Sequence, residues 1–227
     1  GRDVLSFSPR GHSFSSKAFE IESRKGPMRF EFEEVFGPES KQGELYARFG
    51  PTLLDCSTSG VTKQLNFCLL AYGQTSSGKS FTLVGERDLP GLIPRFLADL
   101  FARREEFREE ATFDVVYSFF EIYKEKIFDA LQPGEKSLNI REFAGNEVVI
   151  EGLTRKRACS LTEVYADLGA AVARRRAAET VLNKRSSRSH FVASFEVSIS
   201  CQLQSGRSSC EAPGPVALRG SSCGCIP

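Results

Sequence analysis

The chain has 227 residues, of which 41% are hydrophobic and 26% charged, with a formal net charge of +1. This length and composition suffice for one sizeable core, and the near-neutral charge argues against a nucleic acid as the general partner. No apolar run of 18 residues is present and no apolar signal segment begins the chain, so neither a membrane span nor secretion is expected. The chain has seven cysteines, an odd number scattered along the sequence, and we expect them to be reduced thiols.

In the first part of the chain, the patterns that predict regular structure become stronger toward residue 30. Residues 1–28 are rich in Ser, Gly and Arg and carry two weak strand patterns, whereas residues 30–36 begin a stronger strand pattern. A short helix is predicted over residues 45–54, bent or broken near Pro51. A polar loop is predicted at residues 57–60.

An apolar run at residues 65–71 leads directly into a glycine-rich loop. The run is typical of a strand buried on both faces of a sheet. Residues 73–80 then read Gly-Gln-Thr-Ser-Ser-Gly-Lys-Ser and match G-x-x-x-x-G-K-[ST], the pattern of a loop that binds nucleotide phosphates. Gly73 and Gly78 allow a tight turn and close approach of the backbone to a ligand. The loop amides are therefore predicted to form an anion site at the start of a helix.

Three side chains at the end of this loop suit a nucleotide bound with magnesium. Lys79 is a mobile positive charge for the outer phosphates, and the Ser80 hydroxyl is a hard oxygen ligand of the kind Mg²⁺ prefers. Phe81 has two equally supported interpretations: plain burial in the core and, as the family resemblance given below implies, stacking on an adenine ring. The alternative for the whole loop is a Gly/Ser turn with an unrelated Lys, but the full spacing and the preceding apolar run favour the phosphate site.

Two amphipathic helices are predicted after the loop. Apolar residues at 93, 96, 97, 100 and 101 form one stripe of a helix that begins near residue 90. Residues 161–172 repeat this spacing, with Ser160 as N-cap and Glu163 completing a capping box. Arg174–Arg176 have two interpretations: a basic patch for nucleic acid, or, preferred here, charges placed near a helix C-terminus.

Three strands are predicted between and after these helices. Residues 115–120 are apolar on both faces, residues 148–150 form a short strand, and residues 191–199 alternate as in a half-buried strand. Strands that alternate with helices predict an α/β sandwich, in which a sheet lies between two helical layers.

Residues 183–190 read Asn-Lys-Arg-Ser-Ser-Arg-Ser-His. Together with residues 71–80, this segment resembles the kinesin motor domain, in which A-Y-G-Q-T-x-S-G-K-[ST] is the phosphate loop and N-x-x-S-S-R-S-H is switch I. Segments 30–36, 91–96 and 119–123 resemble further parts of the family pattern, so that the resemblance spans about residues 29–200.

The resemblance implies a P-loop NTPase fold, a three-layer α-β-α sandwich with a mixed central sheet, that binds ATP and Mg²⁺. It implies microtubules (tubulin) as the partner, in the cytoplasm and cytoskeleton, and neither a nucleic acid nor a membrane. Asn183, Ser186, Ser187 and Arg188 are the implied catalytic switch, and Ser80 and Ser187 the implied metal-side residues. His190 is implied to hold the switch rather than act as a base. The implied nucleotide contacts are Gly73, Gln74, Thr75, Ser76, Ser77, Gly78, Lys79, Ser80 and Phe81.

The chain departs from the family pattern at both ends. Switch II, D-x-x-G-x-E, is expected after the strand that follows switch I, yet no Asp occurs after Asp167, and the only acid after that strand ends near Ser200 is Glu211. We therefore expect an incomplete fold that lacks switch II. The expected domains are a weakly ordered segment 1–28, a partial motor domain 29–203, and a disordered tail 204–227 unrelated to the family.

Three functional interpretations remain open on the sequence. The first is a kinesin-type ATPase that couples hydrolysis to movement along microtubules. The second is a non-catalytic module that binds nucleotide, or touches tubulin through residues 129–153, without turnover. The third is a truncated product that does not fold stably. The sequence does not indicate the direction of movement, the cargo or the oligomeric state.

Overall fold

The computed structural model describes residues 5–6, 16–23, 26–58, 67–132, 134, 136–143, 147–181, 189–201 and 218–224. The chain divides into two compact units, residues 1–48 and 49–227, which are described separately below. Among the described residues, no helix combines the length and the apolar character that a membrane crossing requires.

The first unit contains a small antiparallel sheet. Its strands are β1 (Leu5–Ser6), β2 (Ser16–Ser23) and β3 (Gly26–Val35), in the order β1-β2-β3. Strand β3 confirms the strand predicted at residues 30–36. Helix α1 (Gln42–Thr58) begins in this unit, and the boundary between the units falls within it.

Helix α1 is longer than predicted from the sequence. Pro51 lies inside the helix, which continues to Thr58. The hydroxyls of Ser57 and Thr58 donate to the carbonyls of Leu53 and Leu54 at 2.7 and 2.9 Å. The predicted polar loop is therefore wrong for these two residues, because each hydroxyl finds its partner four residues back within the helix.

The second unit is built on a sheet whose described ladders are antiparallel, in the order β10-β6-β11-β12 with β7 paired to β6. Its longest strands confirm those predicted at 115–120 and 191–199. Strand β12 falls within the stretch 204–227, for which the sequence predicts a tail without regular structure. The strands are β6 (Ala111–Tyr123), β7 (Lys126–Asp129), β10 (Lys156–Arg157), β11 (Ser189–Cys201) and β12 (Leu218–Gly224).

The core of this unit lies on the face of the sheet that carries the odd-numbered residues of β6 and β11. Phe119 is fully buried, and its ring centroid lies 5.2 Å from that of Tyr117, 6.1 Å from Phe191 and 5.9 Å from Phe195. Most even-numbered residues of both strands are only half-buried. The alternation follows from the two-residue period of a strand.

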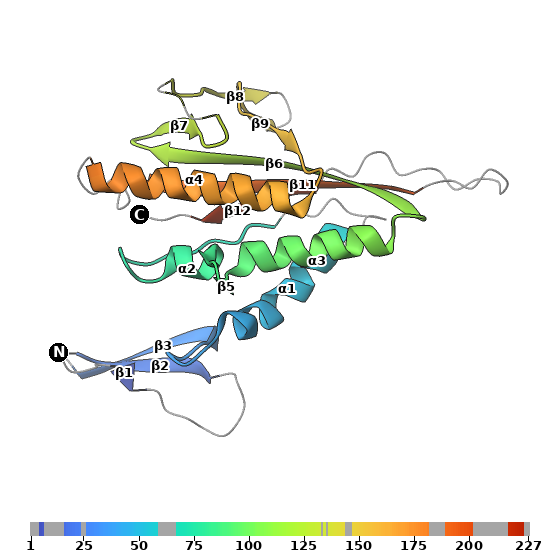
Figure 1. Cartoon of the computed structure of the whole chain (residues 1–227). Coiled ribbons are helices and arrows are strands. Elements are labelled where there is room, and N and C mark those ends of the chain that lie inside the picture. The colour runs from blue at the N-terminus through green and yellow to red at the C-terminus, as the bar shows by residue number, and fades with distance from the viewer. Residues whose placement is uncertain are drawn as a thin grey trace. The chain divides into compact units, whose positions relative to one another are not determined.

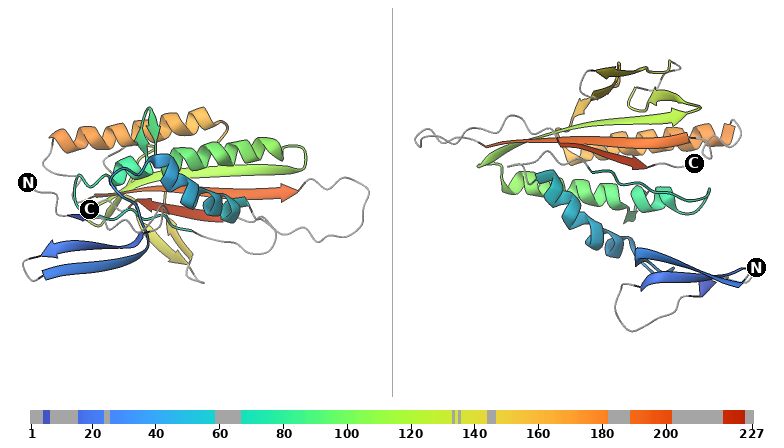
Figure 2. Two further views of the ribbon diagram at one scale, coloured as in Figure 1. Left: turned by 90° about the horizontal axis from the view of Figure 1, so that it is seen from below. Right: turned by 180° about the vertical axis from the view of Figure 1, so that it is seen from behind.

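Helices α3 (Leu92–Glu106) and α4 (Leu161–Val181) pack on this odd-numbered face (Figure 1). The Phe107 ring, just after α3, stacks on Phe113 of β6 at 6.4 Å, and Tyr117 of β6 donates to Asp167 of α4. Figure 2 shows the two helices side by side along the strands. Both helices confirm the amphipathic patterns predicted near residue 90 and at residues 161–172.

The remaining described elements of the second unit, besides the end of α1, are short. Helix α2 (Lys79–Leu83) is followed by the hairpin of β4 (Gly85–Glu86) and β5 (Leu89–Pro90), which leads into α3. Strands β8 (Ile140–Phe143) and β9 (Glu147–Ile150) form a second hairpin, and β9 confirms the short strand predicted at 148–150.

The apolar run before the glycine-rich loop is not a strand in its described part. Residues 67–73 have no regular structure, Leu70 is exposed, and Tyr72 is 87% exposed. No described strand pairs with this segment. The predicted strand buried on both faces is therefore wrong for these residues, because no described strand lies beside them to pair with their backbone groups.

The turn between α2 and α3 depends on a glycine with no room for a side chain. Gly85 has a φ of 80°, and a Cβ there would lie 2.2 Å from the Leu89 carbonyl oxygen and 2.3 Å from the Gly91 nitrogen. Because of this positive φ and these short distances, any residue other than glycine at position 85 would require the backbone to shift.

We expect Gly85→Ala to lower the free energy of unfolding by about 2 kcal/mol, because it adds positive-φ strain to a backbone clash. The matched control is Gly169→Ala, which lies exposed within α4 with open space around its Cα. That change should raise the free energy by about 0.5–1 kcal/mol, because alanine is the better helix former. Urea denaturation measures both, and equal effects of the two changes would contradict the prediction.

Candidate nucleotide site

The loop at residues 73–78 has the backbone geometry that phosphate binding requires. Ser76 and Gly78 have positive φ values of 65° and 88°, while Ser77 between them does not. Such alternation turns successive amide groups to one side, which is how backbone nests for anions form. The Ser77 amide closes the turn by donating to the Gln74 carbonyl at 3.2 Å. A Cβ on Gly73 would lie 2.6 Å from Ser77 Oγ, so this position also favours glycine.

Lys79 is the first residue of α2 and directs its ammonium group back onto the loop. Its Nζ donates to the carbonyls of Gly73 and Gln74 at 2.7 and 2.5 Å, and the residue is only 6% exposed. A buried ammonium is stable only when it is hydrogen-bonded, and the two loop carbonyls meet that need. The arrangement keeps a positive charge beside the loop amides, which suits the outer phosphates of a nucleotide.

Ser80 and Phe81 follow in α2 and differ in exposure. Ser80 is half-buried in the first turn, and its hydroxyl is the hard oxygen donor that Mg²⁺ favours. Phe81 is 41% exposed, so the interpretation of plain core burial does not hold. Leu83 is the buried apolar residue of this helix. The donor types at residues 73–81 thus fit a nucleotide with its magnesium, and the contact of each residue with the ligand stays a prediction.

The second predicted motif is only partly within the described residues. Asn183, Ser186, Ser187 and Arg188, the predicted catalytic switch, lie outside them. Ser189 and His190 of the same motif are described and begin β11. His190 Nδ1 is buried without a hydrogen-bond partner among the described residues.

Contacts between elements bring the beginning of β11 to the end of the sheet near the phosphate loop. Helix α2 contacts β12, and Gly224 at the end of β12 pairs with Phe191 of β11. Figures 1 and 2 show α2, the end of α4 and the beginning of β11 at the same end of the second unit. The described part of the second motif, Ser189 and His190, therefore lies at the same end of the second unit as α2.

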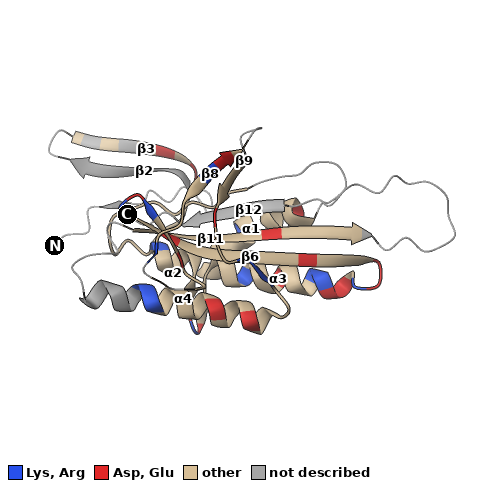
Figure 3. Ribbon diagram, turned by 90° about the horizontal axis from the view of Figure 1, so that it is seen from above, with Lys and Arg blue, Asp and Glu red and all other residues tan. Residues whose placement is uncertain are grey.

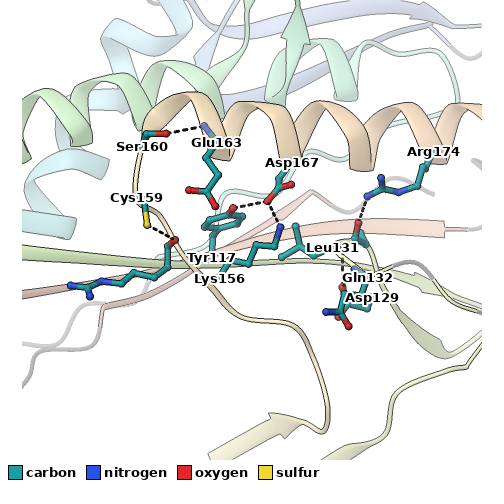
Figure 4. A network of polar contacts seen from close by, with 12 residues as sticks. Tyr117, Asp129, Leu131, Gln132, Lys156, Cys159, Ser160, Glu163, Asp167 and Arg174 are labelled. Carbon is teal, nitrogen blue, oxygen red and sulfur yellow. Dashed lines mark hydrogen bonds and ion pairs between the residues drawn. The ribbon is translucent and has the colours of Figure 1, made fainter.

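A polar network joins the sheet to α4 (Figure 4). Asp167 accepts a hydrogen bond from Tyr117 at 2.6 Å and pairs with Lys156 at 2.8 Å. Burial alone would raise the pKa of Asp167, but the hydrogen bonds from Lys156 and Tyr117 and the charges of Lys156 and Arg174 outweigh it and lower the pKa. Burial and the hydrogen bond to Asp167 raise the pKa of Tyr117. The network therefore favours a charged Asp167 and a neutral Tyr117.

Because the pKa of Asp167 is lower in the fold than its ordinary value of 3.8, its contribution to stability is present above that pH and is lost as the pH falls further. We expect Asp167→Asn to lower the free energy of unfolding by about 1–2 kcal/mol near pH 7. The difference from the unmodified chain should shrink below about pH 4. Tyr117→Phe, which removes one of the two donors, should give a smaller loss. Urea unfolding at several pH values measures both, and a difference independent of pH would contradict this assignment.

The start of α4 forms as predicted, whereas the arginines within it do not act as predicted. The Glu163 amide donates to Ser160 Oγ at 3.2 Å, as expected of an N-cap. Figure 3 shows acidic residues near the start of α4 and basic residues in its middle, and no basic residue lies in its last turn. Arg174 donates instead to the Ala130 carbonyl and Arg175 to Ser189. The interpretation of these two arginines as charges at a helix C-terminus is therefore wrong, because the helix extends past them to Val181.

The sequence did not predict the contacts of three polar residues, one of which holds loops in place while the other two join a strand to a helix. The Asp129 carboxylate accepts hydrogen bonds from the Leu131, Gln132 and Thr154 amides, which ties together the chain on both sides of the β8–β9 hairpin. Glu121 and Arg175 form an ion pair between β6 and α4. A signal existed for Glu121, because it is the charged residue on the otherwise apolar odd-numbered face of β6.

Comparisons with known proteins agree with this fold and loop. The family model for the kinesin motor domain matches residues 4–217. Kinesin-related protein 7 of Dictyostelium discoideum is 33% identical over 192 residues, covering 82% of this chain and 15% of that protein. Kinesin-like protein KIF22 of Mus musculus is 38% identical over 168 residues, covering 73% of this chain and 25% of that protein. The chain thus spans a quarter or less of the length of these relatives.

A solved structure of a fast kinesin superposes on the chain with a TM-score of 0.79 at 26% sequence identity. The match covers 98% of this chain and 58% of that one. The predicted α/β fold of the P-loop NTPase class is therefore confirmed. Fold, phosphate-loop motif and relatives agree that the chain belongs to the kinesin motor domain family.

Proposed function

We propose that this chain is part of a kinesin motor that binds ATP with Mg²⁺ through residues 73–81. In the whole protein, ATP hydrolysis then drives movement along microtubules in the cytoplasm. The observation that supports this most is the buried Lys79 ammonium, held on the Gly73 and Gln74 carbonyls at the start of a helix. The solved relative is described by its ATPase mechanism and its interactions with microtubules. We propose neither a nucleic acid nor a membrane as a partner of this chain.

The proposed roles follow the order of residues along the loop. The amides of residues 73–78 and the Lys79 ammonium bind the phosphates, which carry negative charge. Ser80 and Ser187 are proposed ligands on the metal side, and bound Mg²⁺ would neutralise charge that develops on the phosphates. Phe81 offers an exposed ring for the base. Asn183, Ser186 and Arg188 are proposed to complete the switch.

The domain assignment is also a proposal. We propose that residues 29–203 form the main part of the motor, within the longer family match over residues 4–217.

A second candidate function is binding to tubulin without turnover. The β8–β9 hairpin carries three large apolar side chains, Ile140, Phe143 and Val148, each more than half exposed. Ile140 and Val148 lie on one face of the hairpin and Phe143 on the other, as the strand register shows. Exposed apolar side chains can mark a contact with a partner protein. The Asp129 hydrogen bonds at the base of the hairpin would hold this surface in place. Binding to tubulin without turnover requires no ATP hydrolysis, so a measurement of phosphate release distinguishes this candidate function from the first.

Two measurements on the purified chain test the proposal. The first is titration with a fluorescent ATP analogue, with Mg²⁺ and then with EDTA, where saturable binding strengthened by Mg²⁺ is expected. The second is phosphate release with and without microtubules. Release that microtubules stimulate supports the motor function, whereas nucleotide binding and co-sedimentation without release support the second candidate. A chain that melts cooperatively and binds no nucleotide would overturn the proposal.

A further inference from the structure

The chain that enters the phosphate loop is anchored on helix α3 by an aromatic contact. The Phe67 ring lies edge-on to the Phe96 ring, with their centroids 6.0 Å apart and an interplanar angle of 79°. Phe96 belongs to the second turn of α3 and is only 6% exposed. Phe67 is half-buried, whereas Leu70 and Tyr72, which follow it before the loop, are exposed. Phe67 thereby ties the entering chain to the core.

The chain that leaves the loop is anchored at the beginning of the same helix. Leu83, the last residue of α2, is buried, and the amide of Gly91, the N-cap of α3, donates to the Val84 carbonyl at 3.1 Å. A Cβ on Gly91 would lie 2.6 Å from the Thr82 carbonyl oxygen, so the backbones of α2 and of the start of α3 are in direct contact. Both ends of the loop are therefore held by the first two turns of α3.

The two anchors control how the entering chain meets α2. The Lys79 ammonium belongs to α2, and it donates to the carbonyls of Gly73 and Gln74, which belong to the entering chain. No strand in the described part of the chain pairs with residues 67–73, so no described ladder holds this segment. The ring contact at Phe67 is a contact that can hold the two carbonyls within reach of Lys79.

We propose that Phe67 is a positioning residue for the phosphate loop, and that it acts through its ring contact with Phe96. The residue lies outside the G-x-x-x-x-G-K-[ST] pattern, so the motif alone does not identify it. An anion site made of backbone amides binds best when its amides are already aligned, and a chain fixed at both ends supplies that alignment. The inference rests on the proposed function.

Phe107 provides a matched control at the other end of α3. Its ring is half-buried like that of Phe67, and it stacks on Phe113 with the centroids 6.4 Å apart. Phe107 lies about 16 Å from Phe96 along the helix, so its loss should lower stability without moving the loop. Leu70→Ala is a second control, because it removes a 55% exposed side chain from the entering chain itself.

The test is the affinity of the full chain for the same fluorescent ATP analogue, with Mg²⁺ and with EDTA. An aromatic pair contributes up to about tenfold to an equilibrium constant, so we expect Phe67→Ala to weaken binding about tenfold. The loss should be the same under both conditions, because the contact holds the loop and not the metal. Phe67→Leu should restore part of the affinity, since it keeps an apolar contact with Phe96. Phe107→Ala and Leu70→Ala should bind like the unmodified chain.

Two further measurements separate positioning from a general loss of structure. Phe96→Leu keeps an apolar side chain in the core but removes the ring contact, so it should weaken binding about threefold, and combining it with Phe67→Ala should add less than about twofold. Hydrogen exchange followed by mass spectrometry should show faster exchange of the amides of residues 73–78 in Phe67→Ala, with α4 as protected as in the unmodified chain.

The outcomes distinguish this inference from the proposed function. Equal affinities of Phe67→Ala and the unmodified chain, or an equal loss in Phe107→Ala, would overturn the inference and leave the proposed function standing. An unmodified chain that binds no nucleotide would overturn both.

Discussion

Lys79→Ala is expected to weaken binding of the ATP analogue about 100-fold, the largest functional effect of any single change in this chain. The Lys79 ammonium is buried next to the loop and already donates to the Gly73 and Gln74 carbonyls. Charged hydrogen bonds of this type contribute about 1.5–3 kcal/mol each, and about 2.7 kcal/mol corresponds to a factor of 100 in affinity. Fluorescence titration in the presence of Mg²⁺ measures the change.

Its control is Lys126→Ala, which removes an exposed lysine from β7 in the same unit. That variant should bind the analogue like the unmodified chain. The free energy of unfolding of Lys79→Ala should also fall, by about 1–3 kcal/mol, because two loop carbonyls lose a charged donor. A Lys79→Ala chain whose affinity stays within threefold of the unmodified one would contradict the assignment of this loop to phosphate binding.

Phe119→Ala is expected to lower the free energy of unfolding by about 3–5 kcal/mol, the largest effect on stability. The ring is fully buried between Tyr117 on the same strand and Phe191 and Phe195 on β11. Its removal leaves a cavity that the surrounding aromatic rings cannot fill without leaving their rotamers. Since a domain of this kind is stable by only about 5–15 kcal/mol, the loss is a large part of the total.

Phe143→Ala is the matched control, because it makes the same chemical change on β8, where the side chain is 51% exposed. We expect a loss below about 1 kcal/mol there. Urea denaturation followed by circular dichroism compares the two variants directly. Similar losses at Phe119 and Phe143 would show that the aromatic cluster on the odd-numbered face is not the core of the second unit.

Much of the secondary structure near the site was predictable from local patterns. The apolar stripe at residues 93–101 and the alternation at 191–199 each depend on a period that the sequence displays, and both became the expected elements. The N-cap at Ser160 was predictable for the same reason, since its partner is only three residues away. The phosphate loop was recognisable because its glycines and its lysine have fixed spacing.

The contacts that assemble the site were not predictable in this way. The segment at residues 67–73 is apolar enough for a buried strand, yet whether it becomes one depends on neighbouring strands that no local pattern encodes. Arg174 and Arg175 are adjacent and chemically identical, yet one meets Ala130 and the other meets Ser189. Their partners lie on other elements, so their roles appear only when the helix is packed on the sheet.

By itself, therefore, the sequence determined the elements, the phosphate loop and the resemblance to a family, because each depends on residues close together along the chain. Only the tertiary structure decided which face of the sheet α3 and α4 cover and which buried charges meet. It also decided that α2 and the start of β11 lie at the same end of the second unit. Contacts such as those of Tyr117 with Asp167 and of Glu121 with Arg175 join residues about 50 positions apart. Their free energy depends on burial and geometry that exist only once the chain has folded.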